Sequence, residues 1–396
     1  MNGKIADPLD KTSNPVESAP VSLKPPPAVY ATTRDGGIDT LRGVSILLVL
    51  LHHFNIAYPL RETALGGYAI WPLLQAVARN GNYGVTIFFV ISGFLITRNA
   101  LERWDRLDAI RPIPFWRLRL ARIVPTLVLT LVLVDTLALA GLPLFGNRAG
   151  SAVSLWTTNA AALGAWMNVL VIREGWINYA LGVMWSLSVE MAFYLLFPLA
   201  CVLLRRGAWL LALAGLLIVA GPLYRLMNQG DAEAWLYGYL ACFDAIAIGC
   251  CAAVLARSQA WPAVRRTFVR PVAGIAMAAL YLAWPISRSN VLGVSAMALG
   301  AALLLLGRDQ ASPSSAGPAR RLLRRCGRDC YEIYLLHLIV LGLLRTYAPS
   351  AHYQGAARLG LLLVFFVGSS VLGALVSRWY STPLNRALRA RTAGRA

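Results

Sequence analysis

The stretch LRGVSILLVLLHHFNIAYP, residues 41–59, decides the fold of this chain. It is almost continuously apolar, and it has about the 20 residues that an α-helix needs to cross a hydrocarbon core roughly 30 Å thick. A membrane-spanning barrel strand would instead alternate apolar and polar residues. Because only helices and closed barrels satisfy their backbone hydrogen bonds within lipid, the pattern predicts a transmembrane helix.

Nine further apolar runs of similar length follow this one. They fall at residues 84–100, 115–141, 181–204, 208–226, 235–256, 270–286, 290–307, 329–347 and 357–378. Hydrophobic residues make up 58% of the 396 residues and charged residues only 14%, against roughly 25% charged residues in soluble domains. We therefore predict an all-α, polytopic membrane protein with about ten transmembrane helices.

The terminal segments differ in composition from the membrane domain, which we place at residues 35–385. Residues 1–34 are rich in proline, serine, threonine and lysine, a composition typical of a disordered tail. Residues 386–396 form a short basic tail. The first apolar run begins at residue 41, too far from the N-terminus for a cleavable signal peptide.

Arginines gather in alternate loops between the apolar runs. The segments after the second, fourth, sixth, eighth and tenth runs are arginine-rich, whereas the intervening loops carry at most two lysines or arginines each. Positive charge is enriched in short cytoplasmic loops. The alternation predicts that both termini lie in the cytoplasm.

The net charge of +19 does not indicate a nucleic-acid partner, because its placement follows the membrane topology. All three lysines lie in the N-terminal tail, and most arginines lie between apolar runs. The six cysteines show no metal-ligand or redox spacing, and they fall inside or beside apolar runs, where we interpret them as packing residues. We expect no nucleic acid, no metal and no permanently bound cofactor.

Ionisable side chains lie within the apolar runs. At a rise of about 1.5 Å per residue, His53 falls near the middle of the membrane. Glu190, Asp244 and His337 reach similar depths on three other runs. Ser186 lies four residues before Glu190 and shares its helix face. Ionisable groups inside a membrane are costly and usually functional. We therefore favour a functional centre over the alternative, a polar cluster that only joins helices.

Arginines also lie at the predicted cytoplasmic mouth. Arg119 and Arg122 share one helix face, and Arg42 lies within about 20° of the face of His53, about 16 Å away along the helix. Ordinary inner-loop arginines would show the same spacing. A fixed guanidinium cluster, however, suits phosphates. Acyl-coenzyme A, with its charged nucleotide and long thioester arm, matches this layout.

The longest outer connection, residues 142–180, carries tryptophans and asparagines together, among them Trp156, Trp166, Trp176, Asn159, Asn168 and Asn178. One interpretation is an interfacial segment anchored by tryptophan. Another is a platform on which aromatic rings and amides meet a sugar. The two are compatible.

Six stretches of this chain resemble the acyltransferase 3 family of membrane O-acyltransferases, over roughly residues 34–388. They are GIDTLRGVSILLVLLHHF (37–54), FFVISGFLI (88–96), FWRLRLARIVP (115–125), WSLSVEMAFYLLFP (185–198), CFDAIAIG (242–249) and CYEIYLLH (330–337). The family's paired Arg and His, its RxxR motif and its SxxxE motif fall on Arg42 and His53, on Arg119 and Arg122, and on Ser186 and Glu190.

The resemblance implies transfer of an acyl group, commonly acetyl, from cytoplasmic acyl-CoA to a hydroxyl of a cell-surface or exported glycan. Lipopolysaccharide, exopolysaccharide, peptidoglycan and lipid-linked saccharides are the implied acceptors. The resemblance also implies a multi-pass protein that lies in the lipid bilayer of the cell membrane. In a bacterium this would be the inner membrane. Acyl-CoA, typically acetyl-CoA, would then be a co-substrate rather than a resident cofactor.

Three positions depart from the family pattern. Cys242 stands where an arginine is usual, Met191 where a second acidic residue often follows Glu190, and Thr382 where a glutamate often precedes proline. The chain also ends soon after its last apolar run, so we expect no additional esterase-like domain.

The resemblance and the layout together suggest a mechanism. We expect Arg42, Arg119 and Arg122 to bind the phosphates of acyl-CoA. His53 would accept the proton of the attacking hydroxyl, and Glu190 with Ser186 would orient its imidazole.

Supporting roles are expected for three more residues. His337 or a nearby donor would steady the developing oxyanion, and Asp244 and Tyr334 would support the site. We expect direct transfer, because no motif places a cysteine or serine beside His53.

Two other classes of protein remain as alternatives. A transporter also combines many spans with polar sites at mid-membrane, but no convincing internal repeat is present. A receptor or scaffold explains neither the mid-membrane acids nor the mouth arginines. Within enzymes, the alternative acceptor is a small lipophilic metabolite.

Overall fold

The computed structural model describes residues 35–258, 263–306 and 317–393. The tail expected to be disordered, residues 1–34, lies outside this part of the chain. Within the described ranges, β pairing is limited to two isolated bridges, Thr63 with Gly355 and Asn147 with Asn178. The expected all-α fold is confirmed.

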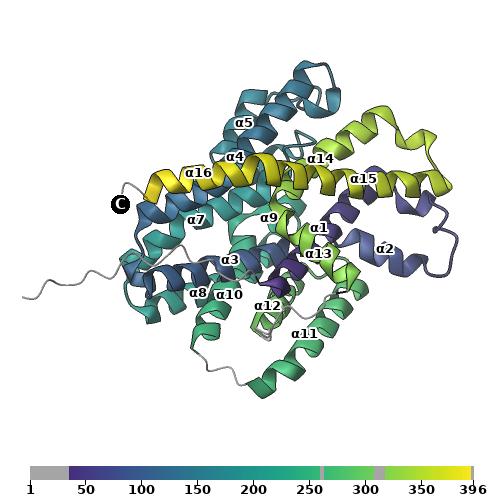
Figure 1. The fold of residues 1–396 in the computed structure, drawn as a ribbon. Coiled ribbons are helices and arrows are strands. Elements are labelled where there is room, and N and C mark those ends of the chain that lie inside the picture. Colours follow the sequence, from purple (N-terminus) through teal and green to yellow (C-terminus); the bar gives the residue numbers. More distant parts are fainter. Residues whose placement is uncertain (1–34, 259–262, 307–316, 394–396) are drawn as a thin grey trace, which may run out of the picture. The chain divides into compact units, whose positions relative to one another are not determined.

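The α-helices are α1 (Gly36–Ala57), α2 (Trp71–Arg79), α3 (Asn82–Trp104), α4 (Pro112–Leu139), α5 (Leu155–Leu163), α6 (Met167–Glu174), α7 (Met184–Leu204), α8 (Gly207–Met227), α9 (Ala232–Tyr237), α10 (Tyr239–Arg257), α11 (Ala263–Ala283), α12 (Gly293–Leu306), α13 (Pro318–Arg328), α14 (Cys330–Tyr347), α15 (Gly355–Val376) and α16 (Thr382–Ala393). Figure 1 shows their arrangement.

Eight helical segments of the described chain are long and apolar enough to cross a membrane. They are Gly36–Ala57, Asn82–Trp104, Pro112–Leu139, Met184–Leu204, Gly207–Met227, Ala232–Arg257, Cys330–Tyr347 and Gly355–Ala390. These match eight of the ten expected runs, so the chain is a multi-pass membrane protein. The other two runs, 270–286 and 290–307, coincide with the apolar helices Phe268–Ala283 and Gly293–Leu306, which are shorter than a full span within the described residues.

Helix α1 is held at both ends. At its start, the side chain of Asp35 accepts hydrogen bonds from the backbone N–H groups of Gly37 (2.9 Å) and Ile38 (3.2 Å), which satisfies donors that a helix start leaves free. Beyond its end, the hydroxyl of Tyr58 donates to the carbonyl oxygen of Ala348 at 2.7 Å. The second contact joins the ends of α1 and α14.

Glycines let helices α3 and α10 cross in close contact. A β-carbon at Gly93 would overlap the carbonyl oxygen of Ile246, and one at Gly249 would overlap the carbonyl oxygen of Val90. The contact is therefore reciprocal. Small residues in membrane helices allow such backbone approach, since packing rather than the hydrophobic effect drives helix association in lipid.

Helices α1 and α13 cross in the same way. Gly43 faces the carbonyl oxygen of Leu323, and Gly327 faces that of Asp39. A side chain at either glycine would meet backbone rather than a flexible neighbour. This crossing holds the arginine-rich helix α13 against the first turns of α1, beside Arg42.

The C-terminal helices α15 and α16 are joined by a π-helical segment, Ser377–Ser381, and form one long rod in Figure 1. Helix α16 packs against α4. The residues expected in a basic tail from position 386 are thus helical as far as Ala393. The charge of Arg389 on α16 acts on those of Arg119 and Arg122.

The connection at residues 142–180 is folded, and its amides are used internally. The side chain of Asn178 donates to the carbonyl oxygen of Phe145 at 2.9 Å. The side chain of Asn168 donates to the carbonyl oxygen of Tyr237 at 3.2 Å. Asn159 donates to Asp135 at 2.8 Å. These amides therefore bond the connection to itself, to α4 and to α9, which weakens the interpretation that they form a sugar platform.

Replacing Gly249 by valine will lower the stability of the folded protein by about 1–3 kcal/mol, because the new side chain must push α3 away from α10. Thermal unfolding of the detergent-purified protein measures the change. Gly215→Val on α8 is the matched control, since a β-carbon there has no neighbour within 4 Å. Equal losses in the two variants would contradict the close crossing of α3 and α10.

Candidate functional site

His53 on α1 and His337 on α14 face each other. Their ring centroids are 4.9 Å apart with an angle of 61° between the ring planes. Nε2 of His337 lies 3.4 Å from Nδ1 of His53. His337 is buried and His53 is half-buried. The two histidines that the sequence places at similar depths therefore meet, and we call them the histidine pair.

Backbone carbonyls determine which nitrogen of each ring carries the proton. Nδ1 of His53 lies 2.9 Å from the carbonyl oxygen of Val49, and Nδ1 of His337 lies 2.6 Å from that of Tyr334. Because a carbonyl oxygen only accepts, Nδ1 must be the donor in each neutral ring. Nε2 of His53 therefore keeps its lone pair and can accept a proton. Nε2 of His337 directs its own lone pair toward the N–H of His53.

Ser186 reaches the histidine pair through Tyr334. Its hydroxyl lies 2.7 Å from the hydroxyl of Tyr334, which in turn donates to the carbonyl oxygen of Val183 at 3.0 Å. The ring centroid of Tyr334 lies 5.7 Å from that of His337. Ser186 and Tyr334, both expected at the site, are thus brought together.

Glu190 has partners that the sequence analysis did not identify. Its Oε1 accepts hydrogen bonds from the hydroxyls of Ser92 on α3 and Tyr194 on α7, and these two hydroxyls are 3.2 Å apart. This carboxylate therefore accepts its hydrogen bonds from two hydroxyls. The sequence analysis expects it instead to orient the imidazole of His53. Both partners lie in the quoted stretches 88–96 and 185–198, but neither has a charge that would single it out.

Three arginines, Arg42, Arg119 and Arg122, gather at one end of the site, and we call them the arginine cluster. The charges of Arg42 and Arg122 act on that of Arg119, so the two stretches of sequence that carry them lie near each other. The guanidinium of Arg119 lies over the ring of Tyr194, 5.5 Å from its centroid, and that of Arg122 lies 5.9 Å from the ring centroid of Tyr331.

The arginine cluster lacks carboxylate partners. Among the described residues, none of the three guanidiniums forms an ion pair or a hydrogen bond. The acid whose charge acts most strongly on Arg122 is Glu332, but that buried carboxylate accepts a hydrogen bond from Ser381 at 2.6 Å. Three half-buried guanidiniums thus share the nearby charges of two carboxylates, Glu190 and Glu332. The excess positive charge favours an anion, and the guanidinium fork matches phosphate oxygens.

Side chains on α14 and α7 connect the arginine cluster to the histidine pair. Tyr331 and His337 are six residues apart on α14, which corresponds to about 9 Å along the helix. Tyr334 lies between them. Glu190, whose charge acts on Arg119, lies one turn from Ser186 on α7. The two halves of the expected site are thus neighbours.

Asp244, which the sequence analysis places at the site, lies in a different environment from the histidine pair. It is buried in an ion pair with Arg225 of α8, whose Nη2 lies 2.7 Å from its Oδ2. Ser295 of α12 also donates to this carboxylate at 2.6 Å. The sequence predicts that Asp244 lies at the same depth as the histidines and meets them. Its partners are instead on α8 and α12, because depth alone does not specify which neighbouring helix a side chain faces.

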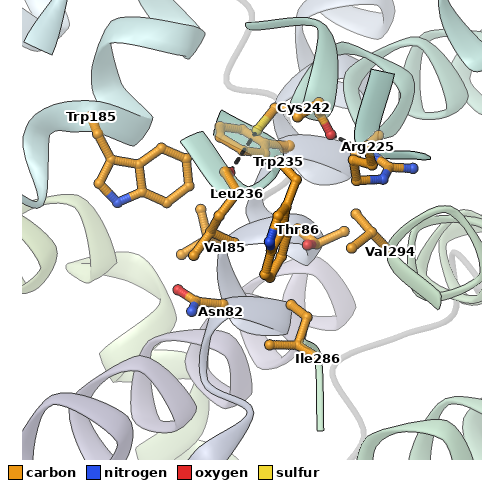
Figure 2. A pocket seen from close by; sticks show the side chains of 13 residues that line it. Asn82, Val85, Thr86, Trp185, Arg225, Trp235, Leu236, Cys242, Ile286 and Val294 are labelled. Carbon is orange, nitrogen blue, oxygen red and sulfur yellow. Dashed lines mark hydrogen bonds between the residues drawn. The ribbon is translucent and has the colours of Figure 1, made fainter. Parts of the chain in front are cut away.

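Arg225 lies beside Asp244, two residues along α10 from the position where Cys242 departs from the family pattern (Figure 2). Its guanidinium is fully buried, and besides Asp244 it donates to the carbonyl oxygens of Ala241 and Val291 and to the hydroxyl of Ser295. An arginine from α8 is thus the cationic partner of Asp244 on α10. The sequence shows Arg225 near the end of the apolar run 208–226, but sequence reasoning alone gives it no role.

Comparisons with known proteins agree with this arrangement of motifs. The family model described as an acyltransferase domain matches residues 35–379. The peptidoglycan O-acetyltransferase OatA of Listeria monocytogenes is 27% identical over 162 residues, which are 41% of this chain and 23% of that protein. The O-acetyltransferase OatA of Staphylococcus aureus is 29% identical over 169 residues, 41% of this chain and 24% of that protein.

The chain matches only about a quarter of the length of these curated relatives. No solved structure is significantly similar to it. The family match, in contrast, extends over most of the chain and contains the histidine pair, the arginine cluster and the Ser186–Glu190 motif. This chain therefore belongs to the acyltransferase 3 family.

Proposed function

We propose that this protein transfers an acyl group from acyl-CoA to a hydroxyl of a cell-surface or exported glycan. The observation that carries the proposal is that one site contains an imidazole with an available Nε2 lone pair and a group of arginines without ion pairs. Arg42 lies on the same helix as His53, and Arg119 and Arg122 lie near it on α4. The relatives are named O-acetyltransferases, which supports acetyl as the group that this protein transfers.

The arginine cluster binds the donor in this proposal. Phosphates of the nucleotide lie among Arg42, Arg119 and Arg122, where they supply the missing negative charge. The pantetheine arm then runs past Tyr331 and Tyr334 toward His53. Arg42 and His53 are eleven residues apart on α1, about 16 Å along its axis, so the donor reaches from the mouth of the site to the base.

The histidine pair transfers the proton. The acceptor oxygen attacks the thioester carbon while Nε2 of His53 takes the hydroxyl proton. The tetrahedral intermediate then collapses, the carbon–sulfur bond breaks, and the departing thiolate receives the proton from His53. The Nδ1–H of His53 donates to the carbonyl oxygen of Val49, and the lone pair on Nε2 of His337 lies 3.4 Å from the same nitrogen. Both stabilise the positive charge of the imidazolium, the role that a carboxylate has in a catalytic triad.

This arrangement changes the role proposed for His337. A neutral His337 carries its proton on Nδ1, which is already donated to the carbonyl oxygen of Tyr334. It therefore has no donor to offer an oxyanion near His53, and we assign it to positioning that base. Glu190 is assigned to the neighbourhood of Arg119, where it holds Ser92 and Tyr194.

We further propose that both termini and the arginine cluster lie on the cytoplasmic side of a bacterial inner membrane. Arginine enrichment in alternate loops supports this orientation. Cytoplasmic acyl-CoA then meets the cluster directly. The acceptor approaches from the opposite side, where surface and exported glycans are available.

Replacing His53 by glutamine will lower the rate of acyl transfer by about 10²–10⁴-fold, since the base is lost while the side chain stays polar. The assay follows release of CoA thiol by purified protein given acetyl-CoA and envelope glycan from a strain lacking the gene. His352→Gln, in an exposed turn, is the control. Full activity of the His53 variant would remove the assigned base.

Replacing Arg119 and Arg122 by glutamine will raise the KM for acetyl-CoA at least tenfold, because charge-assisted hydrogen bonds to phosphate are lost. S-acetylpantetheine, which lacks the nucleotide phosphates, separates this effect from damage to catalysis. The double variant and the wild type should use it equally well. Arg117→Gln, at an exposed position on the same helix, should leave both donors unaffected. An unchanged KM for acetyl-CoA would rule out the phosphate site.

A further inference from the structure

Helix α13 lies where two membrane spans begin. In Figure 1 it lies beside the start of α1, and its backbone meets Gly43 there through the carbonyl oxygen of Leu323. The end of α13 coincides with the start of α14, since Asp329 follows the one helix and precedes the other. Both α1 and α14 are long and apolar enough to cross a membrane. These two connections place α13 at the membrane–water interface.

The arginines of α13 occupy one face of the helix. They make up five of its 11 residues, and at about 100° per residue they fall within an arc of about 140° around the helix axis. We call them the arginine face, which consists of Arg320, Arg321, Arg324, Arg325 and Arg328. On the other side of the helix, Cys326 and Gly327 are buried against the protein. A basic face opposite an apolar one is typical of helices that lie on a membrane surface.

The arginine face points away from the rest of the protein. Four of its five side chains are exposed, and only Arg324 is half-buried. Arg324 lies against the first residue of α1, because a β-carbon added at Gly36 would overlap its guanidinium. Leu322, which borders the arginine face next to Arg325, is also exposed. An apolar side chain beside a basic face suits the boundary between lipid headgroups and acyl chains.

The charge of the arginine face is not balanced by acidic residues of the helix. Helix α13 contains no aspartate or glutamate. Within the described chain, the guanidiniums of Arg320, Arg321 and Arg325 form no ion pair or hydrogen bond. Arginines of other arginine-rich segments, in contrast, form ion pairs with acidic residues, as in Arg98–Glu102, Arg106–Asp108 and Arg257–Asp105. Unbalanced positive charge next to a membrane span attracts anionic lipid headgroups.

The arginine face is distinct from the arginine cluster. The groups whose charges act most strongly on Arg119 and Arg122 lie on other helices than α13. The cluster is half-buried, whereas the arginine face is mostly exposed. From Arg320 to Arg328 it extends about 12 Å along the helix. A long, open row of guanidiniums suits several phosphate groups side by side, as a lipid surface presents them, better than one soluble ligand.

We propose that the arginine face of α13 binds the phosphate groups of anionic phospholipids at the bilayer surface. The guanidiniums donate to phosphate oxygens, and Leu322 enters the boundary with the acyl chains. Because Gly43 and Gly327 hold α13 and α1 in backbone contact, lipid bound to α13 also secures the first turns of α1. Such binding requires only a membrane protein and is independent of acyl transfer.

Thermal unfolding of the full chain in a neutral detergent measures this binding, because a ligand of the folded state raises the unfolding temperature. Phosphatidylglycerol will raise it at low salt, whereas phosphatidylcholine, whose phosphate is balanced by choline, will not. Changing Arg320, Arg321 and Arg325 together to glutamine will raise the phosphatidylglycerol concentration for half the effect by about tenfold or more. Changing the same three residues to lysine, which keeps the charge, should retain most of the stabilisation.

Arg111, Arg117 and Arg206, exposed arginines outside α13, provide the matched control, since changing them to glutamine removes the same amount of charge. This control variant should respond to phosphatidylglycerol like the wild type. Equal losses in the two triple variants would show that net charge alone attracts the lipid and would overturn the proposal. No stabilisation of the wild type, equal stabilisation by phosphatidylcholine, or an unchanged response of the α13 variant would also overturn it. An equal effect of glycerol 3-phosphate would identify a site for a soluble anion instead.

The KM for acetyl-CoA separates the lipid site from the proposed donor site. The α13 glutamine variant should keep the wild-type KM, whereas the variant with Arg119→Gln and Arg122→Gln should not. An equal rise of KM in both variants would place the arginines of α13 in the donor site and would overturn the lipid site. Stabilisation by phosphatidylglycerol in a protein that transfers no acetyl group would support the lipid site and refute the transferase.

Discussion

A polar group inside a lipid bilayer must find its partner within the protein, because the hydrocarbon offers none. Most of this chain obeys that constraint. Arg225, wholly buried, is surrounded by Asp244, Ser295 and two backbone carbonyls. Arg358 is similarly buried and donates to the carbonyl oxygen of Pro59 at 2.7 Å. Removing one partner of a buried pair typically costs about 3–5 kcal/mol, so these contacts determine how the helices associate.

The arginine cluster departs from this constraint. Within the described chain, its three guanidiniums form no ion pair or hydrogen bond, and they share the nearby charges of Glu190 and Glu332. The excess positive charge suits the phosphates of the proposed donor. The histidine pair, in contrast, has its Nδ1 atoms bonded to backbone carbonyls and leaves an Nε2 lone pair on His53.

Close helix crossings bring these regions together. Gly43 and Gly327 seat α13 against the start of α1, next to Arg42, and Gly93 and Gly249 seat α10 against α3. Helix α3 then contributes Ser92, which is bonded to Glu190. Since an added β-carbon at these glycines would meet backbone, the spacing of the helices cannot relax without moving the side chains that line the site.

The sequence by itself determined the helical class, the membrane location, the pairing of Arg119 with Arg122, and the shared face of Ser186 and Glu190. Hydrophobic length and helical periodicity are local properties, so residues close in sequence suffice to reveal them. Only the tertiary structure decided that His53 meets His337, that Glu190 bonds to Ser92 and Tyr194, and that Asp244 pairs with Arg225. Depth along a helix can be counted from the sequence, but the direction in which a side chain finds its partner depends on how neighbouring helices are rotated and packed, which no single run of residues encodes.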